Sequence, residues 1–97
     1  MPFVMNMSWD GVTAAQYEEL RKLVNWEGNR APGGVFHVAA FSPQGLKVTD
    51  VWESPEDFNR FVEQRLMPGV GKVGIKGEPK VELLPTHAVF APAYQRI

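Results

Sequence analysis

Two adjacent segments in the middle of the chain are apolar on both of their faces, and this feature restricts the fold most. Residues 35–41 and 46–53 are rich in β-branched and aromatic side chains. The four residues between them, Ser-Pro-Gln-Gly at 42–45, suit a tight turn with proline second and glycine fourth. The sequence therefore predicts a β-hairpin. Since a strand with one face in water alternates apolar and polar residues, we expect both faces of this hairpin to be covered.

A first helix is predicted from about residue 13 to residue 26. Residues 13–16 (Thr-Ala-Ala-Gln) have the capping-box pattern, with Thr13 as the N-cap. Apolar side chains then recur at helical spacing, with charged side chains opposite them. The apolar stripe consists of Tyr17, Leu20, Leu23 and Val24.

A second helix is predicted from Ser54 to about Leu66. Residues 54–57 (Ser-Pro-Glu-Asp) combine a favoured N-cap, a proline at the first helical position and two carboxylates at the positive end of the helix dipole. We expect residues 68–69 (Pro-Gly) to break or kink this helix. A glycine- and lysine-rich connection from residue 71 to residue 79 should follow.

Residues 2–8 predict a first strand and residues 80–90 a last strand, interrupted at Pro85. The order is strand, helix, strand, strand, helix, strand. This order predicts an α+β, ferredoxin-like fold, in which a four-stranded antiparallel sheet carries two helices on one face. The 97 residues support one core, so residues 1–97 should form a single domain, with 91–97 as a C-terminal tail or arm. A second copy is the simplest cover for the other sheet face, which predicts a homodimer.

Composition excludes several classes of function. The chain has no cysteine, which removes disulfides, thiol catalysis and cysteine-ligated metals. Its net charge is −1, and the predicted strands contain only two lysine or arginine side chains, Lys47 and Lys80. We therefore expect neither nucleic acid nor a membrane as partner. The N-terminus lacks the basic region of a signal peptide. These features favour a cytoplasmic protein that binds or acts on a small molecule.

His37 and Asp50 are the most informative polar pair. If Ser42 faces Gly45 across the turn, His37 lies opposite Asp50 and Val35 opposite Trp52, and the carboxylate would orient the imidazole as a general base. If Gly45 instead forms a bulge, His37 faces Val51 and Asp50 points to the other side of the sheet. The sequence leaves both registers open. It also leaves open a purely structural histidine in the core or at an interface.

Aromatic residues are the second group of candidates. Trp52, with Trp26, Tyr17, Phe58 and Phe61, could line a pocket for a flat apolar ligand between sheet and helices, or could simply form the core. His87 on the last strand could approach His37 as part of a ligand-binding site. Two histidines with one aspartate would resemble a facial metal triad, but no motif supports that triad, so we expect no metal site.

The segment from Trp52 to Phe61 resembles the W-E-S-x-E-x-F-x-x-F motif of the dimeric α+β barrel superfamily, most often found in its antibiotic-biosynthesis-monooxygenase-like branch. Residues 32–39 (Pro-Gly-Gly-Val-Phe-His-Val-Ala) are similar to small, mostly uncharacterised bacterial members of that branch. The resemblance implies the barrel fold and a homodimer. It does not fix one activity, because the superfamily includes cofactor-free monooxygenases, haem-degrading enzymes, cyclases and isomerases.

The resemblance also implies site residues. Haem-degrading members use an asparagine on the first strand and a tryptophan at the end of the third, positions that Asn6 and Trp52 match. They also use a histidine on the second helix, and residues 54–66 contain none. We therefore expect an enzyme without a tightly held cofactor that acts on a small apolar or aromatic molecule. In it Asn6 would orient a substrate oxygen, Trp52 would shape the pocket, and His37 with Asp50 would move a proton. The alternative is a non-catalytic ligand-binding or dimerising structural module.

Overall fold

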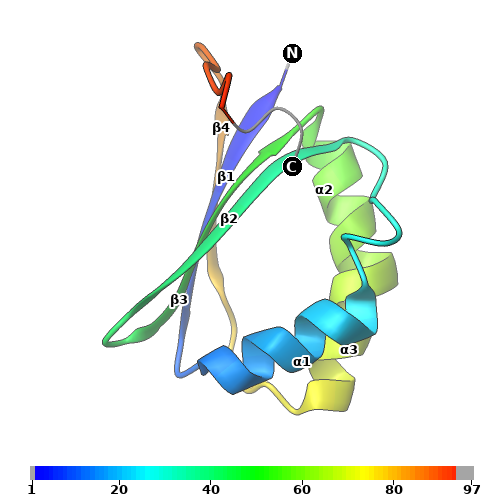
Figure 1. The fold of residues 1–97 in the computed structure, drawn as a ribbon, viewed down its shortest axis with the longest axis vertical. Helices are drawn as coiled ribbons and strands as arrows, with labels where there is room; N and C mark the ends of the chain where they lie inside the picture. The colour runs from blue at the N-terminus through cyan, green and yellow to red at the C-terminus, as the bar shows by residue number, and fades with distance from the viewer. Residues whose placement is uncertain (1, 94–97) are drawn as a thin grey trace.

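The sheet has four antiparallel strands, β1 (Phe3–Asp10), β2 (Gly34–Ser42), β3 (Gly45–Trp52) and β4 (Lys80–Pro85), in the order β2-β3-β1-β4. The structure is a computed structural model that describes residues 2–93. Within these residues all helices lie on one side of the sheet, and the other side, called the bare face below, carries no helix (Figure 1). This is the predicted α+β, ferredoxin-like arrangement.

Helix α1 (Ala14–Val24) begins at the predicted capping box. The Thr13 hydroxyl accepts from the Gln16 backbone N–H at 3.1 Å, and the Gln16 side chain accepts from the Thr13 N–H at 3.0 Å. The helix ends at Asn25, whose left-handed backbone (φ 58°) lets its N–H close the last turn. The first helix is thus confirmed, slightly shorter than predicted.

The second helical segment is longer than predicted and does not end at residues 68–69, so of the two outcomes predicted there, a break or a kink, the break is wrong. Helix α2 (Pro55–Phe61) passes through a π-helical turn, η1 (Val62–Leu66), directly into helix α3 (Met67–Val73). In the π turn the Met67 N–H bonds to the Val62 carbonyl, five residues back. Pro68, which has no N–H to donate, lies just after this turn, at the start of α3. The predicted loop at 71–79 consequently begins only after Val73.

Helices α1 and α3 touch closely at Gly69. A Cβ on this glycine would lie 2.8 Å from a Val24 methyl and 3.0 Å from a Leu20 methyl. The absence of a side chain therefore sets the distance between the two helices.

The β2–β3 hairpin has the first of the two registers considered above. Ser42 faces Gly45 and His37 faces Asp50. The register shifts between Gly34 and Phe36, so Gly34 rather than Val35 lies opposite Trp52. The expected Val35–Trp52 pair is therefore wrong, because one extra residue bulges out of β2.

The two faces of the sheet differ in their cover. Directly paired residues share a face, and the helix-covered face carries the buried side chains of the core. From the strands these are Met5, Met7, Trp9, Leu46, Val48, Asp50 and Trp52. The bare face carries Val4, Asn6, Ser8, Phe36, Val38, Ala40, Lys47, Thr49, Val51, Lys80, Glu82 and Leu84.

The last strand ends earlier than predicted. Strand β4 stops at Pro85, where the Thr86 N–H bonds to the Pro2 carbonyl, and the predicted extension to residue 90 is wrong. Beyond it Val89 and Phe90 are exposed. Of the predicted tail or arm at 91–97, residues 94–97 lie outside the described part of the chain.

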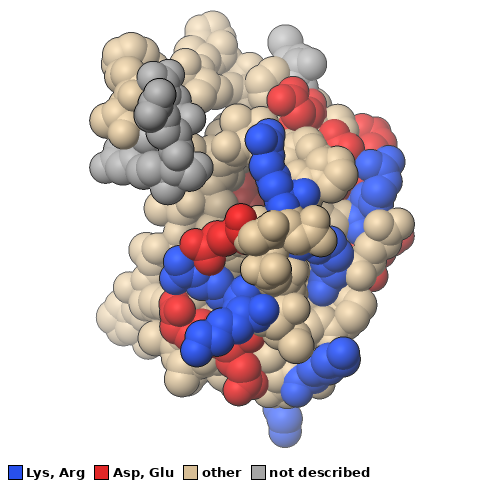
Figure 2. Space-filling model, turned by 45° about the vertical axis from the view of Figure 1, so that its right-hand side comes forward, with Lys and Arg blue, Asp and Glu red and all other residues tan. Residues whose placement is uncertain are grey.

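Across residues 2–93, no helix combines the length and the apolar character needed to cross a membrane. Positive and negative side chains are interspersed on the face shown in Figure 2, and neither sign forms a continuous patch there.

Candidate functional site

His37, on edge strand β2, is at the centre of a chain of hydrogen bonds that links α1 to the core. Its Nδ1 lies 2.6 Å from Asp50 Oδ1, and its Nε2 lies 2.8 Å from the Tyr17 hydroxyl. The second oxygen of Asp50 accepts the Trp52 indole N–H at 3.0 Å. The order of contacts is therefore Tyr17, His37, Asp50, Trp52.

The donors and acceptors in this chain assign the histidine tautomer. A carboxylate only accepts hydrogen bonds, so the bond to Asp50 places a proton on His37 Nδ1. In the neutral ring Nε2 is then an acceptor, and the Tyr17 hydroxyl donates to it. Asp50 is 6% exposed, and the His37 side chain is 34% exposed. The pair thus runs from the core to the surface.

Aromatic rings surround the exposed end of the chain. The Trp26 ring lies 5.3 Å from the His37 ring and 5.8 Å from the Tyr17 ring, centroid to centroid. Phe41 meets Tyr17 edge-on at 6.1 Å, and the Tyr17 and His37 planes are parallel within 3°. The sequence did not single out Phe41 for this site, although its place four residues along the strand from His37, on the same face, could have indicated it.

At the inner end, Trp52 packs against Phe58 at 5.6 Å and Phe61 at 5.4 Å. Trp52 and Phe58 are 4% and 5% exposed, so both belong to the core. Trp52 reaches the polar chain through its indole N–H. Of the five aromatic residues predicted to line a pocket, Tyr17 and Trp26 are thus the two in ring contact with His37.

Burial raises the pKa of Tyr17 from its usual 10.0 to about 12. The negative charges of Glu18, Asp50 and Glu27 also raise it, and the positive charge of Arg21 opposes them. The Tyr17 hydroxyl therefore keeps its proton throughout the neutral range.

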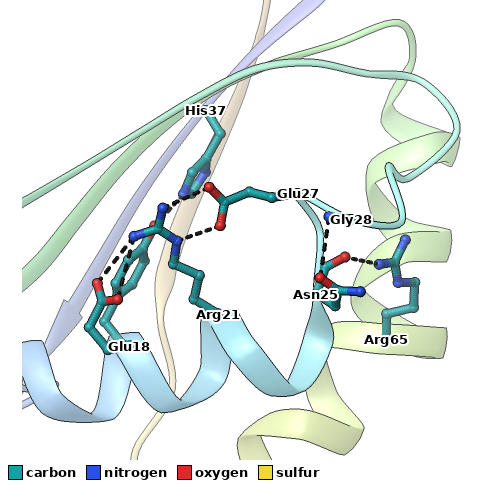
Figure 3. Close-up of polar contacts among 8 residues, drawn as sticks. Glu18, Arg21, Asn25, Glu27, Gly28, His37 and Arg65 are labelled. Atoms are coloured by element: carbon teal, nitrogen blue, oxygen red, sulfur yellow. Dashed lines mark hydrogen bonds and ion pairs between the residues drawn. The ribbon is translucent and has the colours of Figure 1, made fainter. Parts of the chain in front are cut away.

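A charged rim adjoins the site at the surface (Figure 3). Arg21, one turn after Tyr17 on α1, donates two hydrogen bonds to Glu27, at 2.5 Å and 2.7 Å. These bonds hold the pKa of the Glu27 carboxyl below its usual value, and the positive charge of Arg21 adds to that effect. Arg21 also contacts Glu18 at 3.4 Å. This rim is not evident from the sequence, because Arg21 and Glu27 pair across the end of the helix rather than at helical spacing.

Two predicted site residues lie elsewhere. Asn6 is on the bare face of the sheet, where its side-chain oxygen accepts from the Thr49 hydroxyl at 3.1 Å. It therefore points away from His37 and Asp50. His87 follows the end of β4 and is exposed, so the strand does not carry it towards His37. Within residues 2–93, no three histidine, aspartate or glutamate side chains gather in a way that could hold a metal ion.

Two shallow hollows lie on the described part of the surface, and His37 lines neither of them. One of about 120 Å³ lies beside Trp9 and Gly77, and one of about 220 Å³ lies between α1 and α3 at Arg65 and Gly69. Arg65 donates there to the Val24 carbonyl at the end of α1, at 2.9 Å. It also donates to the Asn25 carbonyl, at 3.4 Å (Figure 3). Access to the His37 cluster is instead through its partly exposed outer end.

No family model and no curated protein sequence matches this chain. Solved structures do match it. A protein of unknown function from Nitrosomonas europaea, NE2512, superposes with a TM-score of 0.71 at 16% identity over 95% of each chain. A second protein from that bacterium, provisionally assigned as an antibiotic biosynthesis monooxygenase, gives 0.68 at 13% identity, over 89% of this chain and 90% of its own. SnoaB from Streptomyces nogalater, a cofactor-independent oxygenase, gives 0.61 at 18% identity, over 91% of this chain and 93% of its own.

The chain has the antibiotic-biosynthesis-monooxygenase-like fold. This finding confirms the resemblance that the segment from Trp52 to Phe61 suggested. At these identities the likeness establishes the fold alone. Within this monooxygenase-like fold, the His37 cluster lies between helix α1 and the covered face of the sheet.

Proposed function

We propose that this chain is a monooxygenase-like, dimeric barrel protein of the cytoplasm that acts on a small apolar or aromatic molecule bound at His37. It would do so without a tightly held prosthetic group. The observation that supports this proposal is an oriented His37–Asp50 pair, partly open to solvent and set among the rings of Tyr17, Trp26 and Phe41. A flat molecule can stack on these rings while an acidic proton faces the polar chain.

The pair has the chemistry of a general base. Asp50 fixes the tautomer of His37 and would stabilise the imidazolium that forms when the ring takes a proton. Trp52 would act through Asp50, because its N–H holds the carboxylate in place from the core side. A positioned general base contributes a rate factor of about 10²–10⁴. Asn6 and His87 have no part in this proposal.

A homodimer formed through the bare face of the sheet is part of the proposal. Val38 and Leu84 on that face are 46% and 45% exposed, beside the half-buried Val4 and Val51. A sheet face exposed to water normally carries polar side chains at such positions. A second copy that presents the same face would bury the apolar side chains of this face on both copies.

The second candidate is a non-catalytic small-ligand binding or dimerising structural module. It is favoured by the observation that both ring nitrogens of His37 already have partners within the chain. A histidine satisfied in this way also serves as a structural tie between α1 and β2.

Calorimetric titration with 2-naphthol, a flat aromatic alcohol, tests the proposed site. We expect binding to wild-type protein, and binding about tenfold weaker in His37→Gln, which corresponds to about 1.4 kcal/mol. His87→Gln is the matched control, since it alters an exposed histidine outside the site. Equal affinities in wild type and both variants would place the ligand elsewhere, and no binding to wild type would contradict the proposed substrate class.

A further inference from the structure

Neither ring nitrogen of His37 is free to meet a substrate. Nδ1 is bonded to Asp50 and Nε2 to the Tyr17 hydroxyl. The Tyr17 oxygen, by contrast, uses its one proton in that bond and keeps two lone pairs as acceptors. At the outer end of this chain of hydrogen bonds, the atom that can still accept a proton is therefore the Tyr17 oxygen and not a ring nitrogen of His37.

We propose that Tyr17 is the catalytic residue that meets the substrate, and that its hydroxyl relays the substrate's acidic proton to His37. This inference rests on the proposed function and names the atom through which that function operates. It departs from a direct transfer to His37, which the Tyr17 hydroxyl would obstruct.

The relay balances in one step. The substrate O–H bond breaks and its proton forms a new O–H bond on Tyr17. At the same time the original Tyr17 O–H bond breaks and its proton forms an N–H bond on His37 Nε2. The products are a substrate anion, a neutral tyrosine and an imidazolium beside the Asp50 carboxylate. No oxidant or metal takes part in this step.

The geometry of Tyr17 suits a relay. Its hydroxyl is 2.8 Å from Nε2, well within hydrogen-bond range, and its ring plane is parallel to the imidazole plane within 3°. Phe41 and Trp26 hold the tyrosine ring from two sides, and helix α1 fixes its backbone. A donor held in this way needs little reorganisation when the proton moves.

Burial, more than the surrounding charges, keeps the Tyr17 hydroxyl protonated, which is the form that the relay needs. Glu18, Glu27 and Asp50 raise its pKa and Arg21 lowers it, with burial as the largest cause. The neutral hydroxyl is therefore the resting state at physiological pH. It can also donate a hydrogen bond to the substrate anion once the proton has passed.

The ionisation of bound 2-naphthol, followed by the absorbance of naphtholate during a pH titration, tests the relay. In saturated wild-type protein we expect the naphthol to ionise about one pH unit lower than in free solution, a tenfold change in the ionised fraction. Tyr17→Phe keeps the ring and removes only the bridging oxygen. We expect it to bind 2-naphthol with nearly the wild-type affinity and to lose the shift, as His37→Gln should.

The outcomes separate the relay from the site that it serves. If Tyr17→Phe retains the shift while His37→Gln loses it, the proton reaches histidine directly and the relay is wrong. Binding to wild type with no shift would also overturn the relay, while leaving a binding site at His37 intact. Failure of wild type to bind 2-naphthol would contradict the proposed function itself. An unchanged unfolding midpoint in Tyr17→Phe would confirm that the lost shift is not a loss of structure.

Discussion

The Trp52 indole N–H and Asp50 Oδ2 are 3.0 Å apart, and both side chains lie on the covered face of β3. With His37 on the other oxygen, both carboxylate oxygens of a 6%-exposed aspartate have partners. A buried carboxylate costs several kcal/mol unless it is bonded in this way. Asp50 is thus tolerated in the core because each of its two oxygens is hydrogen-bonded to an aromatic ring, one to His37 and one to Trp52.

Asp50→Asn should reverse the tautomer of His37. The asparagine oxygen can still accept from Trp52, so its NH₂ group is left to donate to Nδ1. The ring must then carry its proton on Nε2, and Tyr17 must become an acceptor. Long-range ¹H–¹⁵N spectra of the histidine ring report this change directly.

Asp57→Asn is the control for that reversal. Asp57 pairs with Arg60 at 3.0 Å and accepts a hydrogen bond from the Ser54 hydroxyl at 2.9 Å, so its partners are not those of the histidine. We expect its spectrum to match wild type. Retention of the Nδ1–H tautomer in Asp50→Asn would show that Asp50 does not determine the state of the ring.

Tyr17 should make stability depend on pH at the alkaline end. Its pKa is about 12 in the folded chain and 10.0 for a tyrosine exposed to water, so between these values the folded protein binds more protons than the unfolded one. Stability should therefore be complete below pH 10 and fall as pH rises through about 12. Tyrosinate absorbance gives the pKa, since the chain has two tyrosines and Tyr17→Phe leaves only Tyr94. The difference in tyrosinate absorbance between wild type and Tyr17→Phe reports Tyr17 alone. A midpoint of that difference near pH 10 would contradict the burial of this hydroxyl.

Leu84→Glu should dissociate the proposed dimer. The substitution places a carboxylate on the bare sheet face, where two copies would desolvate it. Leu23→Glu on α1 is a matched control, since Leu23 is 47% exposed and Leu84 45%. Light scattering after size exclusion should show monomers for Leu84→Glu and dimers for Leu23→Glu and wild type. A monomeric wild type would remove the dimer from the proposal.

Local signals in the sequence were sufficient for most of the fold. The Thr13 capping box and the Ser54 N-cap mark true helix starts, and both side chains make the expected bonds. The turn between Ser42 and Gly45 also sets the register that brings His37 opposite Asp50. In each case the deciding interaction lies within a few residues along the chain.

The errors concern features that depend on distant contacts. The bulge at Val35 and the π turn before Pro68 each shift the register by one residue, and no residue type encodes either shift unambiguously. Asn6 was assigned by resemblance, and its place on the bare face follows from its pairing with Thr49. The bond from Tyr17 to His37 joins residues 20 apart through the packing of α1 on the sheet. Its only sequence signal is a tyrosine within an otherwise aliphatic stripe.

Substitution by alanine should change the stability of the protein in opposite directions at Gly69 and Gly71. Both are in α3, so the gain in helix propensity is the same and cancels between them. A Cβ at Gly69 meets Val24 at 2.8 Å, whereas one at Gly71 meets nothing within 4 Å. We expect Gly69→Ala to be less stable than Gly71→Ala by about 1–3 kcal/mol in chemical denaturation. Equal stabilities would mean that α1 and α3 do not pack closely.

The indole N–H resonances of the three tryptophans, followed during addition of 2-naphthol, test the location of the site most directly. Trp26 contacts His37, Trp52 holds Asp50, and Trp9 donates to the Lys76 carbonyl at the far end of β1. We expect the Trp26 and Trp52 signals to move together with a single affinity while Trp9 stays fixed, and His37→Gln to weaken the response. Movement of Trp9 alone, or no movement of Trp26 at saturation, would contradict a ligand site at His37.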